Sequence, residues 1–377
     1  MSFRIKGRGA VSNDTGRYES LRREAIPEDR WITDNGRIES APDSKEPEFD
    51  PNAVFDELDE SGPRTIVLRD DSKSVITYNK SPDIPFDRSI NPYKGCEHGC
   101  SYCYARPTHA YLGLSPGLDF ETQLYAKYDA PQLLEQELAK KNYKSAPIAL
   151  GSNTDAYQPI ERKLEISKNI LEILADFRHP VTIITKSALI SRDRGLLADM
   201  AKHQLAHVSI SITTLDASLA RDLEPRAASP KRRLELVEEL SQAGIPVSVM
   251  IAPLIPGLND HELEKIMYAA SSRGAVSANY VLLRLPRETA EIFHQWLQKF
   301  RPQKAKRVET LIKDVRGGGS SQASFGQRMR GTGAYAEVIA KRFNLAAKRY
   351  GFSDSNYKLK KTAFKVPNRC LSQLRLF

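Results

Sequence analysis

"APIALGSNTDAYQPIERKLEISKNILEILADFRHPVTIITKS", residues 146–187, contains the repeating unit that decides the fold. Short β-branched runs at 146–152 and 180–187 flank a helix-length segment, residues 161–177, whose apolar residues suit one buried face. Strands that are apolar on both faces and separated by single helices are typical of a parallel sheet with right-handed crossovers. The stretch therefore predicts a βαβ unit.

The same alternation continues in both directions along the chain. Further strand-like runs are "RSINPYKG" (88–95), "HVSISITT" (207–214), "IPVSVMIAP" (245–253) and "NYVLLRL" (279–285). Between two of them a helix is predicted, with Ser229 as its N-cap, Pro230 at its first position and Gly244 just past its end. About six βα units fall short of the eight that close a full barrel.

This count predicts an α/β fold with a partial (β/α)6 barrel of the TIM type, spanning residues 61–300. A doubly wound sheet would also fit the pattern, and either architecture places ligands at the carboxyl ends of the strands. Residues 1–60 are polar with little apolar periodicity, so we expect a flexible segment that is mostly disordered or loosely docked.

Residues 301–377 form a basic block, with 18 Lys and Arg against 4 Asp and Glu. A helix-like run at 334–352 predicts a basic α-helical C-terminal extension, in which aromatic residues are interleaved with the cations. Such a charge asymmetry indicates a polyanionic partner, most often nucleic acid, although a solvated surface would have the same composition.

The chain has no apolar run of membrane-spanning length, and its first residues lack the apolar stretch of a secretory signal. We therefore expect a cytoplasmic protein with no membrane partner. Thiols stay reduced in that compartment, so a tight group of cysteines indicates metal binding or catalysis.

Three of the chain's 4 cysteines lie close together in "NPYKGCEHGCSYCYARP", residues 91–107. Cys96, Cys100 and Cys103 follow the first predicted strand of the barrel. A 4Fe-4S cubane held by three thiolates leaves one iron open for a substrate or cofactor, so the number of cysteines fits. The alternative is a structural zinc site, which needs a fourth protein ligand. The candidates for that ligand are His98, His109 and the distant Cys370.

The CxxxCxxC spacing, with an aromatic residue before the third cysteine, resembles the motif of radical S-adenosylmethionine (SAM) enzymes. The string "CSYCYA" is more similar still to spore photoproduct lyase and its relatives. The resemblance, which covers about residues 85–290, implies a 4Fe-4S cluster, SAM and an electron donor that reduces the cluster. It also implies that Tyr104 relays a radical and that Tyr102 lies near SAM, although simple packing around a cluster would explain either ring.

Residues at the ends of the predicted strands extend the resemblance. Thr154 corresponds to a SAM-contacting serine, and Lys186 to a lysine whose ammonium can meet the carboxylate of the cofactor. Ser209 resembles the remaining hydroxyl contact, with Ser211 as the neighbouring choice of register. One position departs from the family: Ser152 stands where the lyase has its hydrogen-donating cysteine, so the last step of the lyase reaction is not supported.

The chain ends in "QLRLF", Gln373–Phe377, which resembles the peptide by which bacterial repair and replication proteins bind the sliding clamp. Arg375 departs from the usual middle residue, and a tail packed on the body is the alternative.

Together these features predict a radical SAM enzyme of the lyase-like kind acting on nucleic acid, with a damaged or modified DNA base as the favoured target. The alternatives are modification of RNA or protein by the same radical, and a zinc-stabilised nucleic-acid-binding protein without catalysis.

Overall fold

The computed structural model describes residues 7–18, 54–55, 64–319, 321, 324–352 and 358–368. The predicted clamp motif and Cys370 lie outside these residues. In the part of the chain that is described, no helix is long and apolar enough to cross a membrane.

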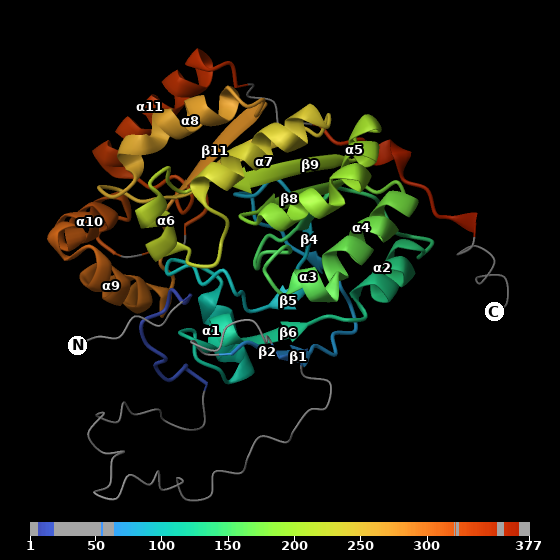
Figure 1. The fold of residues 1–377 in the computed structure, drawn as a ribbon, viewed down its shortest axis with the longest axis horizontal. Coiled ribbons are helices and arrows are strands. Elements are labelled where there is room, and N and C mark those ends of the chain that lie inside the picture. The colour runs from blue at the N-terminus through green and yellow to red at the C-terminus, as the bar shows by residue number, and fades with distance from the viewer. Residues whose placement is uncertain are drawn as a thin grey trace, which may run out of the picture.

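The larger sheet forms the barrel wall (Figure 1). Within the described residues it has seven strands in the order β11-β10-β9-β8-β7-β4-β3. These are β3 (Thr77–Tyr78), β4 (Arg88–Ile90), β7 (Ile148–Leu150), β8 (Val181–Thr185), β9 (Ala206–Ser211), β10 (Val247–Leu254) and β11 (Ser277–Leu282). Every neighbouring pair from β4 to β11 is parallel, and β3 runs antiparallel to β4 at the edge. The predicted partial barrel of six parallel strands is confirmed.

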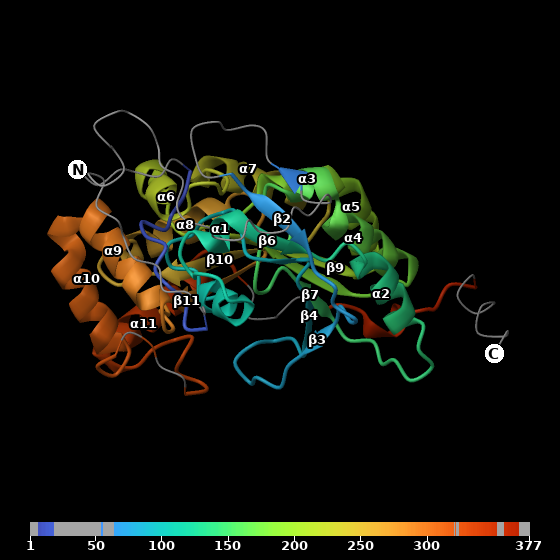
Figure 2. The same cartoon turned by 90° about the horizontal axis from the view of Figure 1, so that it is seen from below.

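Helices cover the outer face of this sheet, as both views show (Figures 1 and 2). The α-helices are α2 (Ala130–Leu138), α3 (Glu161–Leu164), α4 (Ile166–Asp176), α5 (Arg194–Lys202), α7 (Pro230–Gln242) and α8 (Leu263–Ser271), with 3-10 turns at Ala188–Asp193 and Asp260–Glu262. Helix α6 (Ala217–Leu223) instead packs in the apolar cluster around Cys100 and Tyr102. The Ser229 side chain accepts a hydrogen bond from the Arg232 amide at 3.3 Å, which confirms the N-cap of α7. The single helix expected over 161–177 is wrong, because Glu165 adopts a φ of 50° and divides it into α3 and α4.

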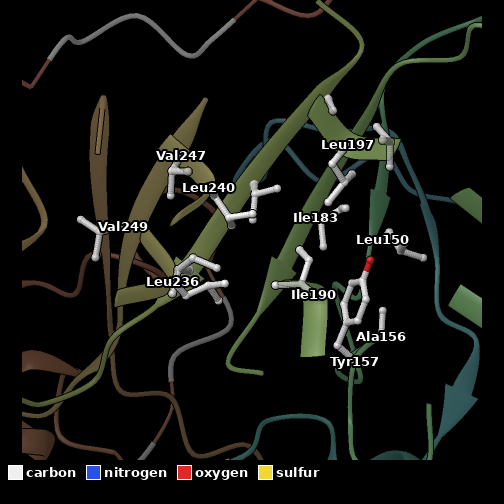
Figure 3. Close-up of a cluster of buried hydrophobic side chains, with 14 of the residues drawn as sticks. Leu150, Ala156, Tyr157, Ile183, Ile190, Leu197, Leu236, Leu240, Val247 and Val249 are labelled. Atoms are coloured by element: carbon white, nitrogen blue, oxygen red, sulfur yellow. The ribbon is translucent and has the colours of Figure 1, made fainter. Parts of the chain in front are cut away.

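The main core lies between the sheet and these helices. Figure 3 shows Leu236 and Leu240 of α7 beside Val247 and Val249 of β10. In β9, Val208 and Ile210 belong to the same apolar cluster. Because side chains alternate along a strand, Ser209 and Ser211 face the inside of the barrel. The sequence thus gives the barrel an apolar outer face and a more polar interior.

A smaller sheet and the C-terminal helices flank the barrel. The sheet has the order β1-β2-β6-β5 and contains β1 (Val54–Phe55), β2 (Ile66–Arg69), β5 (Tyr93–Lys94) and β6 (Gln123–Ala126). Next to it lie α1 (Asp119–Thr122) and a 3-10 helix, Arg106–Leu112. The basic extension carries α10 (Pro302–Val315), α11 (Gly333–Arg349) and a 3-10 turn at Lys361–Ala363. Helix α10 packs on both α9 (Thr289–Phe300) and α11, and α11 packs on α8 (Figure 1).

Candidate functional site

The three clustered cysteines lie on the loop between β5 and the 3-10 helix that begins at Arg106. All three are free thiols; Cys96 and Cys100 are buried and Cys103 is half-buried. Cys103 packs against the apolar group around Cys96 and also against the one around Cys100. Backbone bonds from Gly99 N to Cys96 O and from Cys103 N to Cys100 O turn the loop on itself. The fold therefore gathers the three predicted ligands at one place.

The chemistry of these donors fits an iron-sulfur cluster. Burial, with a smaller contribution from the Asp155 carboxylate, raises the pKa of Cys96 well above its usual value. Burial also raises the pKa of Cys100 to about 12, although Lys186 opposes the shift. Without metal, Cys96 and Cys100 are therefore neutral, and binding of iron would release their protons. Thiolate sulfur is the ligand that iron-sulfur clusters take.

A single metal ion and a 4Fe-4S cubane require different arrangements of their ligands. Among the described residues, no group of three or more His, Cys, Asp or Glu side chains is arranged to hold one ion. A single zinc ion draws all its sulfur ligands to about 2.3 Å from one centre. A 4Fe-4S cubane instead presents a separate iron to each thiolate, so its ligands need not converge on one point.

The two histidines considered as zinc ligands have other partners. His98 Nδ1 lies 3.3 Å from Asp155 Oδ2, and His109 Nε2 lies 2.8 Å from the carbonyl oxygen of Gln123. Asp155 also accepts hydrogen bonds from Thr185 Oγ1 at 2.7 Å and from the Lys186 amide at 2.8 Å. Burial opposes its ionisation, but His98 and these donors lower the pKa of Asp155 to about 2. This carboxylate therefore ties the cysteine loop to the ends of β7 and β8.

Tyr102 is held by a buried charge network. Its hydroxyl donates to the Glu224 carboxylate, which also accepts a 2.5 Å hydrogen bond from Thr213 Oγ1 and pairs with Arg233. Arg233 donates further bonds to the backbone oxygens of Ser211, at 3.0 Å, and Ala228, at 2.7 Å. The ring of Tyr102 is thereby fixed beside Cys100, and its hydroxyl is fully engaged. Sequence reasoning missed Glu224 and Arg233, because neither stands in a recognisable motif.

Lys186 follows β8 and offers a positive charge at the carboxyl end of the barrel. Its ammonium lies 5.9 Å from the centre of the Tyr102 ring and is half-buried. Burial lowers its pKa, but the charges of Cys100 and Glu224 outweigh this and raise it. Within the described residues the ammonium makes no hydrogen bond or ion pair at contact distance. It is therefore a charged group available to an anionic ligand.

The predicted hydroxyl contacts have different environments. Thr154 is buried, and its Oγ1 donates a 2.7 Å hydrogen bond to the carbonyl oxygen of Tyr93. The hydroxyl hydrogen of Thr154 is used in that bond, so toward a ligand Oγ1 acts as a hydrogen-bond acceptor. Ser209 and Ser211 are buried on the inner face of β9, where Ser209 lies next to Ile184 of β8. The fold places both serines and Lys186 on adjacent strands.

Tyr104 lies across the mouth of the barrel. Its hydroxyl donates to the backbone oxygen of Ser152, which follows β7, whereas its ring lies 5.9 Å from the guanidinium of Arg284, which follows β11. The residue is 48 % exposed. The structure therefore brings together Tyr104 and the position at which the lyase resemblance expects a hydrogen donor.

Residues 7–18, here called the N-terminal strap, pack against the cysteine loop. The strap runs between α1 and α9 (Figure 2). The amides of Gly9 and Ala10 donate to the two carboxylate oxygens of Glu121, at 3.0 and 2.8 Å. Arg8 donates to the backbone oxygen of Glu121 at 2.8 Å. Sequence reasoning did not foresee this docking, because polar residues without periodicity give no signal for a contact more than 100 positions away.

Gly9 is expected to be essential for the fit of the strap. A Cβ atom at this position would lie 1.6 Å from the backbone oxygen of Gly99, between the first two cluster cysteines. Gly9→Ala should cost about 1–3 kcal/mol of local stability by displacing the strap. We expect the visible absorbance of the reconstituted cluster to decay about tenfold faster in air. Gly195→Ala is the matched control, since nothing lies within 4 Å of its added Cβ. Equal decay rates in the two variants would contradict this role.

Glu224 is expected to make the metal-free chain sensitive to acid. Burial raises its pKa, but Arg233 and Lys186 lower it from 4.5 to about 2. A carboxyl whose pKa is depressed on folding stabilises the fold above its unfolded pKa, and the stabilisation is lost as the pH falls from 4.5 toward 2. The shift corresponds to about 3 kcal/mol. Urea unfolding across this range should show a shallower pH dependence in Glu224→Gln than in the exposed control Glu172→Gln. Equal slopes would contradict the assignment.

Comparisons with known proteins identify the family of the chain. Residues 90–269 match the family model of the radical SAM superfamily. The protein Rv2578c of Mycobacterium tuberculosis is 35% identical over 240 residues, which cover 62% of this chain and 71% of that protein. The radical SAM Nalpha-GlyT isomerase of Pseudomonas phage M6 is 22% identical over 240 residues, 60% of this chain and 46% of the isomerase.

A solved structure shares the fold. Spore photoproduct lyase complexed with dinucleoside spore photoproduct superposes with a TM-score of 0.56 at 13% identity, over 76% of this chain and 80% of the lyase. The matched family region includes all three cysteines of the loop and the strands from β7 to β10. The chain therefore belongs to the radical SAM superfamily, whose enzymes use a 4Fe-4S cluster and SAM.

Proposed function

We propose that this radical SAM enzyme acts on a nucleic acid, with Cys96, Cys100 and Cys103 holding the cluster. When bound, the reduced cluster supplies the electron that cleaves a carbon-sulfur bond of SAM, and the resulting 5'-deoxyadenosyl radical abstracts hydrogen from an unreactive C-H bond. The protein must bind SAM, orient the substrate and exclude water. A cytoplasmic location suits this chemistry, because thiols stay reduced there.

One observation carries the choice of substrate: cations and an exposed aromatic ring gather at the end of β11. Residues 324–332, here called the C-terminal bridge, reach β11 through a 3.0 Å bond from Leu282 N to Met329 O. The ring of Phe325 is 61 % exposed, and the exposed guanidinium of Arg330 in the same bridge lies 4.0 Å from the ring of Tyr280. Cations bind phosphates and exposed rings stack on bases, so this surface suits a polynucleotide. The shared fold of spore photoproduct lyase, which has been solved with dinucleoside spore photoproduct, supports the same choice.

Each residue of the site would have its own role. Lys186 would pair with the SAM carboxylate, while Thr154 and Ser209 would contact the cofactor through their hydroxyl oxygens. Tyr102 is held too firmly by Glu224 to move, so it would serve as a wall of the SAM site. Tyr104 would relay a radical, a role supported by the position of its hydroxyl at the mouth, where it donates a hydrogen bond to Ser152 O.

Replacing Lys186 tests the cofactor contact. Lys186→Met keeps the length of the side chain but removes its charge, and a charge-assisted hydrogen bond contributes about 1.5–3 kcal/mol. We expect SAM affinity to fall at least about tenfold in equilibrium dialysis, with Lys186→Arg retaining part of it. Iron content should not change. Unaltered SAM affinity in Lys186→Met would contradict the assignment.

The proposed function is tested by following 5'-deoxyadenosine. The reconstituted, reduced enzyme should release it from SAM slowly when alone and faster with DNA that contains damaged or modified bases. RNA and a protein extract serve as parallel arms. Stimulation by RNA or protein, with none by DNA, would overturn the proposed substrate while leaving the cofactor chemistry standing.

We also propose that Gln373–Phe377 bind the sliding clamp and that a separate electron donor reduces the cluster. The clamp motif lies outside the described residues, so its support is the sequence alone. Leu374 and Phe377 would enter apolar pockets while Gln373 hydrogen-bonds. Binding of the purified clamp to the full chain, lost in Phe377→Ala, is the expected result; equal binding by both chains would contradict it.

A further inference from the structure

Arg284 lies two residues beyond β11, at the carboxyl end of the barrel where the reaction site is expected. Its guanidinium lies 5.9 Å from the ring of Tyr104, which itself follows the cluster ligand Cys103. The side chain is half-buried. Arg284 thus places a positive charge at the mouth, within reach of the proposed radical chemistry.

This guanidinium lacks the acceptors that a buried cation needs. Its Nε is buried and has no hydrogen-bond partner, and among the described residues the acceptor that it reaches is the weak one, Met329 Sδ, at 3.7 Å from Nη1. Burial, and next the charge of Arg328, lower the pKa of Arg284. An unsatisfied, desolvated cation is unfavourable unless a partner joins it.

The two neighbouring guanidiniums are already satisfied. Arg328 pairs with Asp83 and also donates to Ser81, both on the loop between β3 and β4. Arg316 is buried and donates to the backbone oxygens of Leu282, at 2.6 Å, and Arg328, at 2.8 Å, among others. These contacts hold the C-terminal bridge across the open edge of the barrel. Arg284, by contrast, has no strong acceptor among the described residues, so its charge is available to an anionic ligand.

The anion could come from SAM or from the substrate. The SAM carboxylate already has a candidate partner in Lys186, which follows β8 and lies beside Cys100 and Tyr102. Arg284 follows the last strand of the barrel and contacts Met329 of the C-terminal bridge. In the same bridge Arg330 is exposed and lies 4.0 Å from the ring of Tyr280. Cations on both the segment after β11 and the C-terminal bridge fit a chain of phosphates better than one carboxylate.

We propose that Arg284 binds a phosphate of the polynucleotide substrate and so holds the reacting nucleotide against Tyr104. The planar fork of a guanidinium matches two oxygens of a phosphodiester, and among the described residues Arg284 Nη1 has a weak acceptor and Nη2 has none. This inference rests on the proposed function. It adds a substrate-binding residue in the barrel domain itself, outside the basic extension.

The test is oligonucleotide binding by the reconstituted full chain. A fluorescein-labelled single strand of about 12 nucleotides, within the site sizes of single-strand binding proteins, is titrated and followed by anisotropy at several salt concentrations. Arg284→Gln should weaken binding about tenfold and make the salt dependence shallower by about one phosphate contact. Arg178→Gln, exposed and just before β8 at the opposite end of the barrel, loses the same charge and should bind like the unaltered chain.

Parallel dialysis with SAM distinguishes the two sources of the anion. Arg284→Gln should bind SAM with unchanged affinity, in contrast to Lys186→Met. Weaker SAM binding with intact oligonucleotide binding would overturn the proposal in favour of a cofactor contact. If the unaltered chain binds the oligonucleotide and Arg284→Gln binds it equally well, the phosphate site is refuted while the proposed function survives. If the unaltered chain binds no oligonucleotide, the proposed substrate fails together with this site.

Discussion

Replacing Cys96, Cys100 and Cys103 together by alanine is expected to abolish the cluster and, with it, all cleavage of SAM. The loop supplies the thiolates, and no other cysteine lies in the described residues to substitute for them. Iron and sulfide should fall from about four each per chain to background, and 5'-deoxyadenosine formation should fall more than about 100-fold. Both are measured after anaerobic reconstitution.

Cys370→Ala is the matched control, because it removes a thiol outside the loop from which the proposed cluster takes its ligands. It should retain both iron and activity. Retention of the cluster by the triple variant would contradict the assignment, and so would stoichiometric zinc in place of iron in the unaltered chain. The second outcome would favour a zinc-stabilised binding protein.

Arg106→Met is expected to have the next largest effect, on stability and on the cluster together. Arg106 and Glu121 form an ion pair whose side chains are both fully buried, and Arg106 Nε donates a 2.9 Å hydrogen bond to Cys100 O. Removing one partner of a buried pair leaves the other charge uncompensated and costs about 3–5 kcal/mol. The same substitution removes the hydrogen bond to the backbone of the cluster ligand Cys100. It also removes the partner of Glu121, the carboxylate that binds the N-terminal strap.

The free energy of unfolding of the metal-free chain, measured with urea, gives the first effect, and iron content after reconstitution gives the second. Lys202→Met is the matched control, since it breaks an ion pair whose partners are about 70 % exposed, which contributes at most about 1 kcal/mol. If Arg106→Met unfolds at the same urea concentration as the control and holds as much iron, Arg106 does not support the loop.

The fold was largely predictable, because its signals are local. Each βα unit alternates a short β-branched run with an amphipathic helix, and the cap residues of α7 stand next to the helix that they bound. The break at Glu165 was not predictable in this way. Leu164, Ile170, Leu171 and Leu174 fit one face of a helix that would continue through position 165, and a glutamate gives no signal for the left-handed φ that it adopts.

The site was predictable where a motif marks it and unpredictable where distant side chains complete it. The spacing of the cysteines is visible within eight residues. Glu121 and Glu224 are ordinary carboxylates in the sequence, yet each lies fully buried at the centre of contacts from several segments. Such roles depend on which segments the fold brings together. The proposed phosphate site at Arg284 is of the same kind, because the absence of an acceptor becomes apparent when its surroundings are known.

The most direct test of the central claim is Mössbauer spectroscopy of the enzyme reconstituted with iron-57, before and after addition of SAM. Three thiolates account for three irons of a 4Fe-4S cluster and leave the fourth to the cofactor. We predict that SAM changes the signal of about one quarter of the iron and leaves the rest as it was. A spectrum that does not respond to saturating SAM would mean that a side chain already occupies the fourth iron, and it would contradict the account.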